Sequence, residues 1–207
     1  MTTLVLNPMQ RDLELFEEFD LSQKTEPIFF FYTWDRPAVT VGKAQRGREQ
    51  IMAEATELGI DCFTRPTGGK AVLHGGDICY SFIGTQADPI YGGKLRDSFK
   101  AVNQMVIKMV NEVLGLSLSG ANKAIGQLGL SPNCFANAVC NEGIYADHKI
   151  VGAAQAMGKR AFIQQGSIQL NRIKYRLESL AKNLTLSDLS HEQYDLIQLA
   201  MELSSKR

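Results

Sequence analysis

Residues 65–77, RPTGGKAVLHGGD, place two Gly-Gly pairs within thirteen positions. Glycine loses more conformational freedom on folding than any other residue, so paired glycines persist where the backbone bends unusually or closely approaches another group. The ordinary interpretation of either pair is a surface turn. Because the pairs separate three short strand-like runs, this stretch constrains how neighbouring strands connect, and the rest of the chain decides whether it does more.

The periodicity of apolar residues predicts an α+β fold with a mixed, mostly antiparallel sheet flanked by helices. Asn7 and Pro8 are typical of the N-cap and first turn of a helix. Apolar residues at three- or four-residue spacing from Leu95 to Val113 predict the longest helix, ended by Gly115. Strands are predicted over residues 27–34, 38–42, 61–65, 71–74, 78–84, 149–157 and 160–169, and another helix over 48–58.

Residues 120–141 are rich in Gly, Asn, Ser and Pro and predict a long loop. Long loops inside compact domains often carry function. Helices are expected over 173–180 and 191–203. Because no linker or repeat divides the chain, we predict that 1–207 is a single domain in which 171–207 is a helical C-terminal extension.

The charge balance argues against a nucleic-acid partner, because Lys+Arg and Asp+Glu both number 22 and no broad basic face is expected. The longest apolar run, near residues 28–32, is too short to span a bilayer, and residues 1–8 lack the positive region of a secretion signal. We therefore expect a cytoplasmic protein with no membrane partner. The four cysteines lack CxxC spacing and paired histidines, so no metal site is predicted.

Four segments combine small, polar and reactive residues: WDRPAVTVGKAQ at 34–45, RPTGGKAVLHGGDICYSF at 65–82, NCFANAVCNEGIYADHKIVGAAQ at 133–155 and QQGSI at 164–168. In this order and at this spacing they resemble the lipoate–protein ligase A family, whose superfamily also contains octanoyltransferases and biotin ligases. The resemblance spans about residues 5–170 and implies a catalytic domain with the biotin/lipoate ligase fold. It also implies acyl transfer to one lysine of a small lipoyl-carrier domain.

The third segment resembles the octanoyltransferase and amidotransferase branch, in which a Cys-Phe pair precedes the lysine of a GRKIAGSAQ-like segment. Here Cys134 stands fifteen residues before Lys149, which begins KIVGAAQ, and Glu142 lies between them. The resemblance therefore implies that Cys134 and Lys149 are the catalytic residues. The fourth segment departs from the Gln-His-Gly-Ser usual in transferases, because Gln165 replaces the histidine and any role for an imidazole there is missing.

The chemistry of acyl transfer to an amine also explains why a cysteine and a lysine would act together. The amine of an acceptor lysine has an unperturbed pKa of about 10.4, so its neutral form is scarce at neutral pH and the acyl donor must be held activated. A cysteine does this by forming a thioester, which divides one difficult step into two easier ones. A neighbouring ammonium such as that of Lys149 would lower the pKa of the Cys134 thiol and stabilise an oxyanion.

We expect the substrate to contact the glycine-rich second segment and part of the third. The N–H groups of the glycine pairs are candidate oxyanion donors, and Val72, Leu73 and Ile78 are expected to line an apolar slot. Arg65 is a candidate for holding a phosphate, and His74 for taking a proton from the incoming amine, although both residue types also serve structural roles. The predicted binding set is Arg65, Thr67, Gly68, Gly69, Val72, His74, Gly75, Gly76 and Gly152.

These features favour an acyltransferase of lipoate metabolism that requires no cofactor. It would move an octanoyl or lipoyl group from an acyl carrier protein or a lipoylated protein, through Cys134, to a lipoyl domain or glycine-cleavage H protein. One alternative is a lipoate–protein ligase that uses ATP and Mg²⁺ to form a lipoyl-adenylate; a biotin ligase fits less well because its Arg-rich glycine loop is absent. Another is a non-catalytic relative that only binds lipoyl carriers, since Gln165 and HGGD depart from the family pattern.

Overall fold

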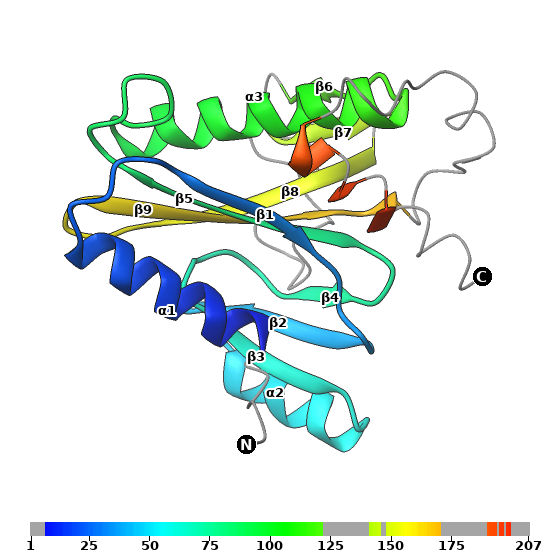
Figure 1. The fold of residues 1–207 in the computed structure, drawn as a ribbon. Helices are drawn as coiled ribbons and strands as arrows, with labels where there is room; N and C mark the ends of the chain where they lie inside the picture. The colour runs from blue at the N-terminus through cyan, green and yellow to red at the C-terminus, as the bar shows by residue number, and fades with distance from the viewer. Residues whose placement is uncertain are drawn as a thin grey trace, which may run out of the picture.

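The computed structural model describes residues 7–121, 141–145, 148–170 and 190–199 except 194 and 197. Figure 1 shows how its elements are arranged. In chain order they are α1 (Pro8–Leu21), β1 (Ile28–Tyr32), β2 (Ala38–Gly42), α2 (Arg48–Glu57), β3 (Asp61–Arg65), β4 (Val72–His74), β5 (Ile78–Thr85), α3 (Leu95–Leu114), β6 (Ser119–Gly120), β7 (Gly143–Tyr145), β8 (His148–Met157) and β9 (Ala161–Ile168).

The strands form two sheets. The larger sheet has the order β1-β5-β9-β8-β7-β6, and all of its neighbouring strands are antiparallel. The smaller sheet has the order β3-β2-β4, in which β2 is parallel to β3 and antiparallel to β4. The predicted α+β class with mixed, mostly antiparallel strands and flanking helices is confirmed, with the strands divided between two sheets instead of one.

The second glycine pair is the point where the chain passes from the smaller sheet to the larger one. Gly75 and Gly76, between β4 and β5, have φ angles of 133° and 128°. Residues that carry a side chain rarely adopt such positive φ values, whereas glycine does so at little cost. A sharp change of direction between the two sheets therefore explains why glycine occupies both positions.

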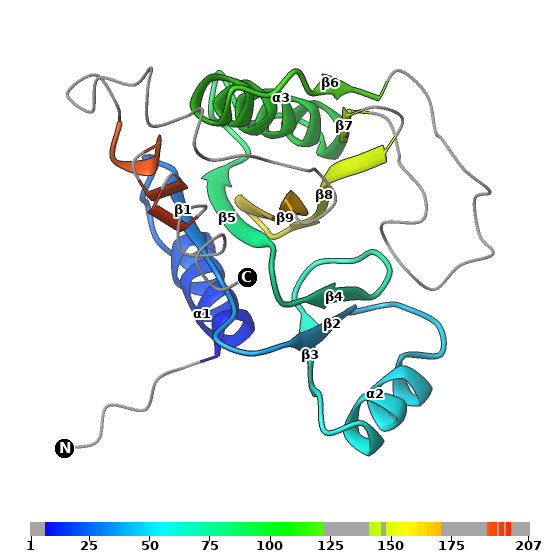
Figure 2. The ribbon, with the colours of Figure 1, turned by 90° about the vertical axis from the view of Figure 1, so that its right-hand side faces the viewer.

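The two faces of the larger sheet have different coverings. Helix α3 lies over one face, whereas α1 and the smaller sheet lie against the other, with α2 on the far side of the smaller sheet (Figures 1 and 2). Val102, Val106 and Val110 of α3 pack with Tyr80 and Phe82 of β5 in the main hydrophobic core. Because side chains alternate along a strand, the other face of β5 is available to form an interface with the smaller sheet.

The helix boundaries agree with the signals in the sequence. The Asn7 side chain accepts a hydrogen bond from the N–H of Gln10 at 3.0 Å, with Pro8 in the first turn of α1. Helix α3 ends at Gly115, which adopts a left-handed conformation with φ of 61°. The predictions of Asn7 as the N-cap of α1 and of Gly115 as the residue that ends α3 are confirmed.

Two short elements were not expected. Strands β6 and β7 flank the predicted loop, and both are too short to produce an alternating pattern. Of the predicted C-terminal extension, 171–189 lies outside the described residues; the described residues between 191 and 199 are helical, and Leu196 is buried in the main core. Within the described part of the chain, no helix is long and apolar enough to cross a membrane.

One carboxylate joins α1 to the β8–β9 hairpin. Asp20, in the last turn of α1, accepts hydrogen bonds from the N–H groups of Lys159, Arg160 and Ala161 at 2.9, 2.7 and 2.7 Å. Burial would raise the pKa of Asp20, but these N–H groups outweigh it and hold the pKa below its usual value of 3.8. The interaction also offsets the unfavourable position of a negative charge at a helix C-terminus.

We predict that Asp20→Asn lowers the free energy of unfolding by about 1–3 kcal/mol at neutral pH, because the charged acceptor of three hydrogen bonds is lost. Since the folded-state pKa is depressed, the stabilisation is complete above the unfolded pKa and disappears as pH falls through the folded one. Urea unfolding at pH 7 and pH 3 measures this, with exposed Glu17→Gln on the same helix as the control. A difference from wild type that does not shrink at the lower pH would contradict this account.

Candidate active site

A narrow cavity of about 30 Å³ lies between the two sheets. It has room for about two water molecules. The smaller sheet forms one wall and the larger sheet the other, and α1 contributes Met9. The lining residues are Met9, Tyr32, Thr40, Arg65, Val72, His74, Cys79, Gly152, Ala153, Ala154, Gln165, Gly166 and Ser167.

Strand register explains why the wall formed by the larger sheet carries small side chains. Cys79 of β5 pairs with Ser167 of β9, which in turn pairs with Gly152 of β8. Since side chains alternate between the faces of a sheet, these three positions face away from Tyr80 and α3. The chain thus places bulky residues on the α3 face and leaves space on the face toward the smaller sheet.

Arg65 holds the first glycine pair in position. Its NH1 group donates to the carbonyl and hydroxyl oxygens of Thr40 at 2.9 and 2.7 Å. Its NH2 group donates to the carbonyl oxygens of Gly68 and Lys70, both at 2.9 Å. Gly69, between them, has a φ of 90°. The buried guanidinium therefore directs its donors at protein acceptors, which supports the loop and argues against a phosphate site at this side chain.

His74 continues this hydrogen-bond network at the end of β4. Its Nε2 lies 2.8 Å from Thr40 Oγ1, and its Nδ1 lies 2.7 Å from Asp77 Oδ2. Because Thr40 Oγ1 accepts from Arg65, its own hydroxyl proton can be donated to Nε2. Nδ1 then carries a proton and donates it to the Asp77 carboxylate. This assignment satisfies every member of the chain from Arg65 to Asp77.

Asp77 connects the network to the larger sheet. Its Oδ2 accepts from Ser167 Oγ at 2.5 Å, and its Oδ1 accepts from the N–H of Gly75 at 3.1 Å. Burial alone would raise the pKa of Asp77, but the His74 side chain, Ser167 and the Gly75 N–H together lower it below the usual value. This carboxylate therefore fixes both the glycine bend and the distance between the sheets.

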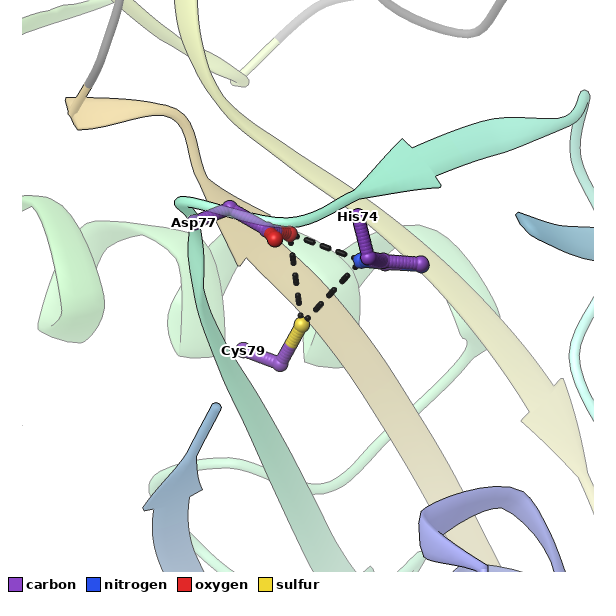
Figure 3. Close-up of side chains that lie close together, drawn as sticks. All are labelled: His74, Asp77 and Cys79. Carbon is purple, nitrogen blue, oxygen red and sulfur yellow. Dashed lines mark hydrogen bonds and ion pairs between the residues drawn. The ribbon is translucent and has the colours of Figure 1, made fainter. Parts of the chain in front are cut away.

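The thiol of Cys79 belongs to the same cluster, which Figure 3 shows. Its Sγ lies 3.4 Å from His74 Nδ1 and donates to Asp77 Oδ2, also at 3.4 Å. Burial, with a further contribution from the Asp77 charge, raises the pKa of Cys79 well above its usual value. In a nucleophile–His–Asp triad the nucleophile and the carboxylate use opposite ring nitrogens, whereas here they share one. The arrangement therefore does not activate Cys79 as a nucleophile.

Gln165 links the glycine loop to α1. Its Oε1 accepts from Thr67 Oγ1 at 2.9 Å, and its Nε2 donates to Asp12 Oδ2 at 2.7 Å. The Asp12 carboxylate, fully buried on α1, also accepts from the Ser81 hydroxyl. The residue that departs from the transferase pattern thus has a specific structural role here, in which its amide supplies both a donor and an acceptor.

Lys149 lies in a buried ion pair. Its Nζ is 2.8 Å from Glu142 Oε1, and both side chains are almost completely shielded from solvent. Glu142 also accepts from the N–H of Ala153 at 3.3 Å. On the same strand His148 is exposed, because neighbouring side chains along a strand point to opposite faces. Cys134, the other predicted catalytic residue, lies outside the described residues.

The predicted binding residues are distributed around the cavity. Arg65, Val72, His74 and Gly152 line it, and Thr67 contacts the lining residue Gln165. Gly68 and Gly69 form the loop held by Arg65, while Gly75 and Gly76 form the bend. Two expectations for the apolar slot are wrong: Leu73 is 61% exposed on the opposite face of β4, and Ile78 is buried in the core under α3.

Sequence reasoning did not identify the contacts that Thr40, Cys79 and Ser167 make in this cluster. Period-2 alternation along ICYSF does place Cys79 on the face opposite Tyr80. That signal does not reveal which strands pair with β5. The cluster becomes visible only when β9 supplies Ser167 and β2 supplies Thr40.

Comparison of the sequence with known proteins identifies related enzymes. Residues 5–191 match the family described as the lipoyl protein ligase A/B catalytic domain. The chain is 29% identical over 172 residues to octanoyltransferase LipM from Carboxydothermus hydrogenoformans, which covers 81% of this chain and 61% of the relative. It spans about 60% of the length of curated relatives of this kind.

Comparison of structures establishes the fold. A crystal structure of lipoate-protein ligase A bound with ATP superposes with a TM-score of 0.59 and 22% identity, over 95% of this chain and 79% of the other. The bipartite lipoate protein ligase of Thermoplasma acidophilum, studied with its E2 lipoyl domain, gives a TM-score of 0.51 and 21% identity, over 95% and 69%. The predicted biotin/lipoate ligase fold is confirmed.

We predict that Gly42→Ala destabilises the protein by about 1–3 kcal/mol, because the added Cβ would overlap the Gly69 carbonyl oxygen and lie within 2.8 Å of the Gly68 carbonyl carbon. Chemical denaturation measures this loss. Gly120→Ala is the matched control, since its Cβ would meet its nearest atom, the Asn141 Cα, at an ordinary 3.9 Å. Equal stabilities of the two variants would show that β2 and the glycine loop are not packed this closely.

Proposed function

The chain belongs to the lipoyl protein ligase A/B catalytic domain family, and we propose that it is an acyltransferase that moves an octanoyl or lipoyl group through a Cys134 thioester to a protein lysine. The similarity to octanoyltransferase LipM over 81% of this chain supports transfer in preference to ligation. The structural observation that carries the proposal is the buried Lys149–Glu142 ion pair. It holds an ammonium group on β8, three residues before Gly152, and Gly152 lines the cavity.

Two acyl transfers account for the reaction. The Cys134 thiolate attacks the carbonyl carbon of the donor, which is a thioester on an acyl carrier protein or an amide on a lipoylated protein. The tetrahedral intermediate then expels the donor thiolate or amine, which takes up a proton. The neutral amine of the acceptor lysine then attacks the new thioester, loses a proton and forms an amide, and the Cys134 thiolate leaves. Each step exchanges one acyl bond for another, so no oxidant, metal or nucleotide is required.

Lys149 suits an electrostatic role in these steps. A positive charge near the reacting carbonyl stabilises the oxyanion of each intermediate and the thiolate that precedes it. The Glu142 carboxylate at 2.8 Å keeps this buried ammonium oriented, so little reorganisation is needed during reaction. The N–H groups of the loop at Gly68 and Gly69 are further candidates for oxyanion donors, because Arg65 holds the neighbouring carbonyls turned toward itself.

The donor and acceptor follow from the same proposal. An acyl carrier protein or a lipoylated protein would supply the acyl group, and a lipoyl domain or glycine-cleavage H protein would receive it. For the alternative ligase reaction, ATP and Mg²⁺ would be needed. The Arg65 side chain, predicted to hold a phosphate, donates to four protein oxygens instead, which argues against triphosphate binding at this residue.

We predict that incubation of the enzyme with octanoyl-acyl carrier protein gives an octanoyl adduct, detectable by intact mass and released by hydroxylamine. Cys134→Ala should abolish the adduct and octanoyl transfer to an apo lipoyl domain. Cys62→Ala, a partly buried thiol on β3, is the control and should form the adduct normally. Lipoate-dependent ATP–pyrophosphate exchange that survives Cys134→Ala would instead establish the ligase.

Substitution of Lys149 tests the electrostatic role. We predict that Lys149→Gln lowers kcat by about 10²–10³-fold, because a fixed charge beside the developing oxyanion is lost. Lys149→Arg, which keeps the charge, should recover part of that loss, and exposed His148→Gln on the same strand should leave kcat unchanged. Melting temperatures of all three variants separate lost catalysis from lost folding, and unchanged kcat in a folded Lys149→Gln protein would refute the role.

A further inference from the structure

The Gly75–Gly76 bend brings three different metal-ligand atoms to one point. His74 lies before the bend, and Asp77 and Cys79 lie after it, so residues within six positions of one another face inward together. The pairs of ligand atoms are close: Nδ1 to Oδ2 is 2.7 Å, and Sγ is 3.4 Å from each of them. Figure 3 shows the three side chains forming a triangle at the junction of the sheets.

The shared use of Nδ1 is what distinguishes this cluster from an acid–base relay. In a nucleophile–His–Asp triad the nucleophile and the carboxylate contact opposite nitrogens of the histidine ring. Here Nε2 is occupied by Thr40, and the carboxylate and thiol both lie at Nδ1. The nitrogen, oxygen and sulfur atoms thus lie around a common point, and each can bind a cation once it carries no proton.

We propose that His74 Nδ1, Asp77 Oδ2 and Cys79 Sγ form a binding site for Zn²⁺. A mixed nitrogen, oxygen and sulfur donor set suits this borderline-soft ion. Tetrahedral coordination with zinc bonds of about 2.0–2.3 Å places ligand atoms about 3.3–3.6 Å apart. The two sulfur distances already match, and the nitrogen and oxygen atoms need to separate by about half an ångström.

The surroundings of the cluster support the same assignment. Metal-bound histidines usually donate their second N–H to a neighbouring oxygen, and Thr40 Oγ1 lies 2.8 Å from His74 Nε2. Ser167 Oγ contacts Asp77 at 2.5 Å and is itself held by Gln169 Nε2 at 2.9 Å. The His74 ring is also stacked on Trp34, with ring centroids 5.1 Å apart. These contacts fix the ligands in orientation.

Charge and protons balance in the bound state. Zn²⁺ with one carboxylate and one thiolate is electrically neutral, which suits a site where all three ligand residues are buried. Binding releases the Cys79 thiol proton to solvent. The His74 proton leaves Nδ1 while Nε2 gains one, and Thr40 changes from donor to acceptor. His74 and Cys79 both line the cavity, so a water molecule or Ser167 Oγ can complete the coordination.

Cobalt substitution tests the proposal without any assay of acyl transfer. The full chain, reduced and freed of metal by a chelator, is titrated with Co²⁺ while its absorption spectrum is recorded. We expect one equivalent to produce a sulfur-to-cobalt charge-transfer band and the intense visible bands of tetrahedral cobalt. One equivalent of Zn²⁺ should then abolish these bands by displacement. A wild-type protein that gives neither band overturns the proposal.

Substitutions identify the ligands. Cys79→Ser should remove the charge-transfer band, and Asp77→Asn, which keeps the side-chain shape, should weaken Zn²⁺ binding at least tenfold in calorimetry. Cys62→Ser and Cys134→Ser are matched thiol controls that should bind as the wild type does. Bands that persist in Cys79→Ser, or that disappear in Cys134→Ser, would refute the site. The Cys134→Ser variant lacks the proposed nucleophile but keeps all three proposed zinc ligands. Its metal binding therefore tests the zinc site independently of the transferase proposal.

Discussion

The structure depends on the backbone reversal at Gly75 and Gly76, which directs β4 into one sheet and β5 into the other. Positive φ angles at two successive residues are accessible to glycine at little cost and strained for other residues. Without this bend the smaller sheet would not lie against the larger one, and no cavity would form between them. The same bend turns His74, Asp77 and Cys79 toward one another, so fold and site share a single backbone constraint.

Buried polar groups hold this interface together, because an unpaired polar group away from water carries a large free-energy cost. Arg65 joins β3 to β2 through Thr40, and Gln165 joins the glycine loop to Asp12 on α1. Such bonds are directional, so they fix the separation and register of the two layers more narrowly than apolar packing does. A network of this kind gives a binding wall that keeps its shape.

Motif spacing and tertiary geometry reveal different features of the candidate site. Motif spacing pointed to the family and to Lys149, and the structure finds Lys149 paired with Glu142, the residue that the spacing placed between Cys134 and Lys149. Charged residue types alone were less informative. From sequence, Arg65 is a candidate either for holding a phosphate or for a structural role. In the structure its NH2 group donates to the carbonyl oxygens of Gly68 and Lys70, because a buried guanidinium needs hydrogen-bond acceptors within the protein.

The sequence by itself determined the local elements: Asn7 and Gly115 mark helix ends, and alternation along β5 separates the Tyr80 face from the Cys79 face. These features depend on interactions within a few residues, so they can be recognised without knowing the fold. Tertiary structure alone decided that the strands form two sheets and that Cys79 meets Ser167. Those outcomes depend on strand order and register, which are set by packing between segments almost ninety residues apart and leave no local pattern in the chain.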